Sequence, residues 1–139
     1  MRSPFISVEL SWEPRISYLL AGLDLDSCND EVREKMKTYN PNCSPDRSEI
    51  VKLFVLPALE YLSYRHRFAI LELLETSLVD KGFDFSVQFE TDYDECSSTV
   101  WDETEIEDPR GFFEEIFKLA GEQWKDDLQK ASLEDQSTW

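Results

Sequence analysis

The sequence predicts an α+β fold: a single compact domain that is mostly helical and has a small antiparallel sheet. Three observations lead to this prediction. The chain has 139 residues, of which 41% are hydrophobic, enough for the core of one domain of common size. Two segments, 5–13 and 83–90, alternate apolar and polar residues as half-buried strands do. Longer segments around them repeat apolar residues at helical spacing.

The predicted strands follow from a period of two. In 5–13 and 83–90 the apolar positions are Ile6, Val8, Leu10 and Trp12, then Phe83, Phe85, Val87 and Phe89. A weaker third strand is predicted over 98–103, around Val100 and Trp101. It would pair with the second strand through an acidic turn at 91–97. Neighbouring side chains of a strand face opposite sides, so one of Val100 and Trp101 should face outward.

The predicted helices are placed by proline, by capping residues and by apolar spacing. Pro14 opens a short helix over 14–22, and a polar surface helix covers 27–39. Ser44-Pro45 has the N-cap oxygen and first-turn proline of a helix start, and Pro57 should kink that helix or begin a new one. The segment 57–80 is predicted to be the longest helix, central and buried because two opposite arcs are apolar.

Asp108-Pro109 is a second cap-plus-proline start, and it opens an amphipathic helix. No internal repeat and no linker rich in Pro, Gly or Ser divides the chain. The sequence therefore predicts one domain over residues 1–131, followed by a frayed C-terminal tail over 132–139.

The charge is strongly negative and unevenly distributed. The net charge is −16; residues 84–139 contain 17 acidic and 4 basic residues, a net charge of −13. A field of this sign repels phosphate backbones and anionic lipids, which argues against direct nucleic-acid or membrane-surface binding. It favours electrostatic steering toward a basic protein partner. Acidity can also serve solubility alone.

Cysteine usage and hydropathy bear on the compartment. The three cysteines form no CxxC pair, and free thiols are the default in a reducing cytoplasm. The first residues lack the apolar core of a signal peptide, and no run approaches the ~20 apolar residues of a membrane span. A cytoplasmic location is expected.

The most informative segment spans residues 90–109, which contain nine carboxylates and no Lys, Arg or His. Tyr93 and Trp101 lie among them, and these two residue types are enriched at binding hot spots. The predicted partner-binding residues are Asp92, Tyr93, Asp94, Glu95, Trp101, Asp102, Glu103 and Glu105. A solvated loop beside a hairpin is the competing interpretation of the same segment.

Catalytic and metal sites are weakly indicated. The single histidine, His66, falls on an apolar arc, which favours a buried, hydrogen-bonded structural residue. The segment 92–95 resembles the start of a calcium loop, but Cys96 and Ser97 stand where such a loop needs an acid or Asn and then Gly. Arg65 and Arg67 form the main basic cluster, and pairing with nearby acids is favoured. No catalytic residue, metal ligand or cofactor is predicted.

The function predicted from these features is that of an acidic inhibitor that neutralises a basic partner. In general character the chain is similar to the small acidic immunity proteins of bacteria, which block toxins such as nucleases; the similarity is to a type and covers no particular residues. A nucleic-acid mimic, of the anti-restriction or anti-CRISPR type, is the first alternative. Such a mimic needs rows of carboxylates along its helices, and Lys118, Lys125 and Lys130 weaken that interpretation. The second alternative is a carboxylate- or metal-dependent enzyme. The oligomeric state and the host are left open.

Overall fold

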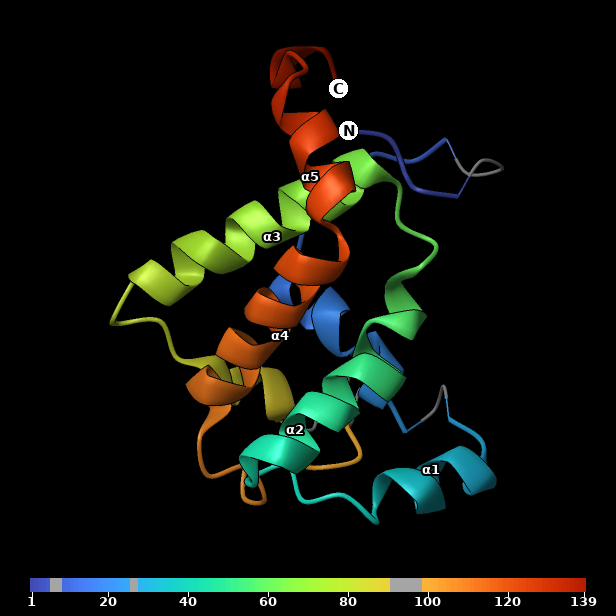
Figure 1. Ribbon diagram of the computed structural model, residues 1–139, viewed down its shortest axis with the longest axis vertical. Helices are drawn as coiled ribbons and strands as arrows, with labels where there is room; N and C mark the ends of the chain where they lie inside the picture. Colours follow the sequence, from blue (N-terminus) through green and yellow to red (C-terminus); the bar gives the residue numbers. More distant parts are fainter. Residues whose placement is uncertain (6–8, 26–27, 91–98) are drawn as a thin grey trace.

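The computed structural model describes residues 1–5, 9–25, 28–90 and 99–139, and these residues form an all-helical fold (Figure 1). The α-helices are α1 (Asp30–Met36), α2 (Ser44–Ile50), α3 (Tyr64–Val79), α4 (Pro109–Gln123) and α5 (Lys125–Ser132). The 3-10 helices are η1 (Ile16–Leu23), η3 (Pro57–Leu59), η4 (Phe85–Phe89) and η5 (Gln136–Thr138), and η2 (Val51–Val55) is a π-helix.

The helices surround one hydrophobic core. Helix α3 crosses α4 and α5, while α1 lies at the far end of the molecule from both termini (Figure 1). Helix α4 supplies the aromatic centre of the core: Phe112 and Phe113 are fully buried, and Phe113 packs against Phe85 with ring centroids 4.9 Å apart. The approach of η1 to η2 is so close that a Cβ on Gly22 would lie 2.0 Å from the carbonyl oxygen of Phe54.

Side-chain caps set where three of the α-helices, α1, α3 and α4, begin. Asn29 accepts a hydrogen bond from the Val32 amide at 2.8 Å, and Asp108 accepts one from Gly111 at 3.0 Å. Such bonds satisfy amides that have no partner within the helix. The predicted start at Asp108-Pro109 is confirmed, with Pro109 in the first turn. Helix α2 begins one residue away from the prediction, because Cys43 and not Ser44 occupies the N-cap.

The predicted helix over 57–80 is divided in two. Residues 57–59 form η3, and α3 starts only at Tyr64, where the Ser63 hydroxyl caps the His66 amide. Pro57 has no N–H to continue the preceding helix, so the interruption predicted there is confirmed. The prediction of one continuous helix overlooked Ser63, whose side chain caps a new helix a few residues after Pro57.

The predicted antiparallel sheet is wrong: the described residues form no sheet and contain two isolated β-bridges, Arg2 with Ser11 and Asp24 with Thr99. Residues 85–89, expected to be a strand, form η4 instead. Asp84 caps this helix by accepting bonds from the amide and hydroxyl of Ser86 at 3.0 and 2.5 Å. Phe85 is two residues from Val87 and four residues from Phe89. The first spacing suits a strand and the second a helical turn, so the pattern fits either structure. Val87, between them, is half exposed.

The strand predicted over 5–13 is also absent from the described residues. The amide of Ser3 bonds to the Leu10 carbonyl at 2.9 Å, and that of Trp12 bonds to the Met1 carbonyl at 2.7 Å. The chain therefore folds back on its own first residues. Residues 6–8 lie outside the described residues.

The third predicted strand, 98–103, is reduced to one bridge at Thr99, with the Val100 amide 2.8 Å from the Leu23 carbonyl. Val100 and Trp101 are both buried, at 7% and 6% exposure, so the expectation that one faces outward is wrong. Alternation holds only in an extended strand, and here the chain turns immediately after Trp101.

The C-terminal segment predicted to fray contains η5, and the Trp139 ring packs edge-on against Phe68 with centroids 5.7 Å apart. The indole Nε1–H of Trp139 also donates to Glu134 at 3.2 Å. The single-domain assignment and the fraying of this tail stay predictions.

Candidate functional site

The acidic turn, residues 102–107, closes on itself through hydrogen bonds. Asp102 accepts from the amide and the hydroxyl of Thr104 at 2.9 and 2.5 Å. The amide of Glu105 bonds to the Asp102 carbonyl at 3.0 Å, and the Glu105 carboxylate accepts from the Asp102 amide at 3.3 Å. The side chain of Asp102 thus holds the turn in the same way as a helix N-cap does.

Asn42, in the loop before α2, fastens the acidic turn to the body of the protein. Its Nδ2 donates to the Glu105 carbonyl at 2.9 Å, and its Oδ1 accepts from the Glu107 amide at 2.9 Å. Between these two bonds Ile106 is buried in the core at 4% exposure. The turn is therefore fixed by a side-chain clamp from one side and an apolar anchor from the other.

The carboxylates of the acidic turn face solvent. Glu103, Glu105 and Glu107 are exposed, and Asp102 is half-buried. The Thr104 hydroxyl, which donates to Asp102, lowers the pKa of that carboxyl from its ordinary value, and the amides of Thr104 and Glu105 act in the same direction. The negative charge of the Asp102 carboxylate is thus present at neutral pH.

Of the eight predicted partner-binding residues, the structure brings three together on this turn: Asp102, Glu103 and Glu105. Trp101 lies in the core beneath them and offers no exposed ring. Asp92, Tyr93, Asp94 and Glu95 lie outside the described residues. Sequence reasoning missed Asn42, whose role depends on a contact 63 residues away along the chain.

Most arginines of the protein are used internally, which leaves the acidic surface without them. Arg110 donates to the carbonyls of Leu78, Asp80 and Phe83 at 2.9–3.1 Å, and Arg47 donates to that of Pro41 at 3.1 Å. Arg33 bonds to two carbonyls in the same way.

The basic cluster is engaged as well. Arg65 pairs with Glu134 at 2.8 Å and Arg67 with Asp127 at 2.6 Å, which confirms the pairing expected for these two residues. Arg67 also lies over the Trp124 ring, 5.1 Å from its centroid. Five of the seven arginines thus bind groups of their own chain.

A second surface feature is an apolar groove of about 210 Å³ where α3, α4 and α5 meet. Its lining residues are Phe68, Leu71, Glu72, Glu75, Phe117, Gly121 and Leu128. The sequence offered a sign of this groove: Phe68 and Leu71 belong to the second apolar arc of the segment 57–80. The sequence predicts that this arc lies in the core, whereas Phe68 is only half-buried.

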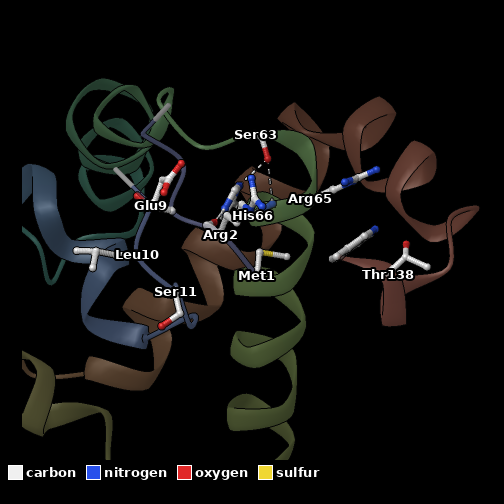
Figure 2. Close-up of a pocket in the computed structure, with 11 residues that line it drawn as sticks. Met1, Arg2, Glu9, Leu10, Ser11, Ser63, Arg65, His66 and Thr138 are labelled. Carbon is white, nitrogen blue, oxygen red and sulfur yellow. Dashed lines mark hydrogen bonds between the residues drawn. The ribbon is translucent and has the colours of Figure 1, made fainter. Parts of the chain in front are cut away.

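A cleft of about 680 Å³ lies between the N-terminal residues, the start of α3 and the C-terminal residues (Figure 2). His66 lies at its wall with both ring nitrogens engaged: Nδ1 is 2.6 Å from the Ser63 hydroxyl, and Nε2 is 2.6 Å from the Arg2 carbonyl. A carbonyl only accepts, so Nε2 carries a proton and donates to the Arg2 carbonyl. His66 is buried and hydrogen-bonded, as the sequence predicted.

Within the part of the chain that the structure describes, no group of three or more His, Cys, Asp or Glu side chains is placed to hold a metal ion. Among the same residues, no helix combines the length and the apolar character needed to cross a membrane. No protein family, curated protein or solved structure matches this chain.

Proposed function

We propose that this protein is an acidic inhibitor that binds and neutralises a basic protein partner in the cytoplasm. The partner class that fits best is a bacterial toxin domain such as a nuclease, which makes the protein an immunity protein. The observation that carries the proposal is the acidic turn: exposed carboxylates held in a fixed place by Asn42 and Ile106, in a chain whose net charge is −16.

Electrostatics explains why a fixed acidic turn suits this role. Charges on one partner that complement those of the other raise the rate of association by about 10- to 1,000-fold at low salt. A fixed turn keeps its carboxylates in register with the cations of the partner and loses little conformational entropy on binding. Nucleases present basic clefts to nucleic-acid phosphates, so an acidic protein competes for the same groups.

The internal use of arginine supports the same conclusion. Five arginines are bound to carbonyls or carboxylates of their own chain, and the other nine basic residues are far fewer than the thirty acidic ones. The unneutralised charge raises the potential around the protein at some cost in self-repulsion. A partner of opposite charge relieves that repulsion on binding.

The first test is to isolate the partner. A tagged protein is recovered from the cells that naturally make it, and co-eluting proteins are identified by mass spectrometry. The proposal expects one basic protein at near-equal amount, whose activity is lost in the complex. Recovery of many unrelated DNA-binding proteins, all displaced by generic DNA, would instead support a nucleic-acid mimic.

The second test locates the binding surface with charge variants. The triple variant Asp102→Asn, Glu103→Gln, Glu105→Gln removes three charges of the acidic turn and keeps hydrogen-bond acceptors at each position. Its matched control, Glu13→Gln, Glu31→Gln, Glu34→Gln, removes three exposed charges elsewhere. We expect the first variant alone to slow association with the partner by about 10-fold at low salt. Equal rates for the two variants would contradict this placement of the site.

A further inference from the structure

The apolar groove between α3, α4 and α5 has no side chain at its centre on the α4 side. A Cβ built on Gly121 has no other atom within 4 Å, so space lies directly above the backbone of α4 at this point. Phe117 stands one turn before Gly121, and Leu128 of α5 completes the apolar lining. Glycine within a helix costs about 1 kcal/mol relative to alanine. The missing side chain thus keeps the groove open at some expense in stability.

The size and shape of the groove favour a protein partner over a small molecule. Its volume of about 210 Å³ is below the range of roughly 300–1,000 Å³ typical of small-molecule pockets. Its lining comes from three helices, and α3 contacts both α4 and α5. Grooves between helices accept the apolar face of an amphipathic helix, whose anchor side chains are spaced three and four residues apart.

The rim of the groove is negative. Glu72 and Glu75 are exposed and lie one turn apart along α3, beside the buried Leu71. On α4, Glu114 is exposed and lies one turn before Phe117 on the same face. Lys118 lies at the edge of that face, so the rim has a net negative charge.

We propose that this groove takes a basic amphipathic helix of the partner, with apolar anchors over Gly121 and Lys or Arg side chains beside Glu72 and Glu75. The inference rests on the proposed function and adds to it the secondary structure and anchor chemistry of the partner segment. The acidic turn then steers the partner electrostatically, and the groove supplies the apolar contact that slows its release.

Charge selects this occupant among those that an apolar groove can hold. A second copy of the chain brings another −16 of net charge and an acidic rim to the same place, and the two repel each other. An anionic lipid surface is repelled by Glu72, Glu75 and Glu114 for the same reason. A basic helix alone satisfies both the apolar floor and the negative rim.

The direct test uses designed peptides as probes. One peptide of about 14 residues has Leu at helical i, i+3, i+4 and i+7 positions and Lys elsewhere. A second has the same composition in a scrambled order without an apolar face. Binding is followed by fluorescence anisotropy, and the site is located from backbone amide shifts of the isotope-labelled protein. We expect the amphipathic peptide to bind more tightly than the scrambled one by about 10-fold or more, with shifts centred on Gly121 and Leu71.

Gly121→Leu is the decisive variant, because a leucine there fills the groove from below. It should lower the affinity for the amphipathic peptide by about 10-fold or more without unfolding the protein, since leucine is a far better helix former than glycine. The control is Gln123→Leu, which places the same side chain on an exposed position of the same helix. A second control pair compares Glu72→Gln, Glu75→Gln with Glu122→Gln, Asp126→Asn, and only the first should weaken binding.

The outcomes separate the groove from the proposed function. Salt-sensitive binding of both peptides that Gly121→Leu leaves unchanged would overturn the groove and leave the acidic inhibitor intact. A dimer that dissociates in the Gly121→Leu variant would also overturn it, since the occupant would be a second copy. The isolated partner can also be tested against both sets of variants. Affinity that is unchanged by the charge variants of the acidic turn but lost in Gly121→Leu would support the groove and contradict the role of the turn.

Discussion

Replacement of Asn42 by alanine tests the clamp that holds the acidic turn. The variant loses two hydrogen bonds, from Nδ2 to Glu105 and from the Glu107 amide to Oδ1, both 2.9 Å long. Each such bond contributes about 0.5–1.5 kcal/mol net, and Asn42 is half-buried, so water replaces part of the loss. We therefore expect the free energy of unfolding to fall by about 1–2 kcal/mol and the melting temperature by about 3–7 °C.

Hydrogen exchange distinguishes a released turn from general destabilisation. The Glu107 amide loses its acceptor in Asn42→Ala, so its exchange rate should rise by about 10-fold, since 1.4 kcal/mol corresponds to a factor of ten. The control is Asn29→Ala, which removes the cap of α1 at a cost of about 1 kcal/mol and should leave the Glu107 amide unchanged. Unchanged exchange at Glu107 in Asn42→Ala would refute the clamp, whatever the change in stability.

Three further predictions concern stability. Gly22→Ala should lower the free energy of unfolding by about 1–3 kcal/mol, because its Cβ would lie 2.0 Å from the Phe54 carbonyl oxygen; an unchanged denaturation midpoint would contradict the close packing of η1 on η2. Gly121→Ala should raise the free energy of unfolding by up to about 1 kcal/mol, since its Cβ meets no atom and alanine favours the helix; a loss of stability in urea denaturation would show that the groove is not open.

The third concerns pH. Arg65, and then Tyr64, lower the pKa of the Glu134 carboxyl below its usual value of 4.5, so the carboxylate stabilises the folded state above that pH and the gain disappears as pH falls through the lower pKa. Denaturation curves of the protein and of Glu134→Gln should therefore differ above pH 4.5 and converge in stronger acid. A difference that persists unchanged at low pH would be inconsistent with the pair.

The helical parts of the fold could be predicted because their signals are local. Asp108-Pro109 specifies a helix start through one side-chain bond and one fixed dihedral angle, and both act within a single turn. The interruption at Pro57 follows in the same way from a missing N–H. His66 was correctly expected to be buried and hydrogen-bonded, since a single polar residue on an apolar arc needs partners.

The sheet was predicted wrongly because alternation in a short aromatic segment does not determine its backbone. The spacing of Phe85 and Phe89 suits either a strand or one helical turn. The hydrogen bonds from Ser86 to the Asp84 side chain stabilise the helical turn. A strand also needs a partner strand, and among the described residues the backbone of residues 10–12 pairs only with the first three residues of the chain.

The candidate site was predictable in its charge but not in its geometry. The nine carboxylates of residues 90–109 locate the acidic segment, yet the position of Trp101 depends on the turn that follows it. The clamp by Asn42 and the opening above Gly121 arise from contacts between distant helices and loops. The Asn42 clamp leaves no mark in local sequence patterns, whereas the apolar positions of Phe68 and Leu71 indicate the groove in part.

The most direct test of the central claim is the salt dependence of the association rate with the isolated partner. The proposal predicts that the rate falls by about 10-fold or more between low and near-physiological ionic strength, where the screening length shrinks to about 8 Å. Loss of the charges at Asp102, Glu103 and Glu105 should flatten that dependence, while the matched control variant keeps it. Association that is fast and equally insensitive to salt in all three proteins would contradict binding through the acidic turn.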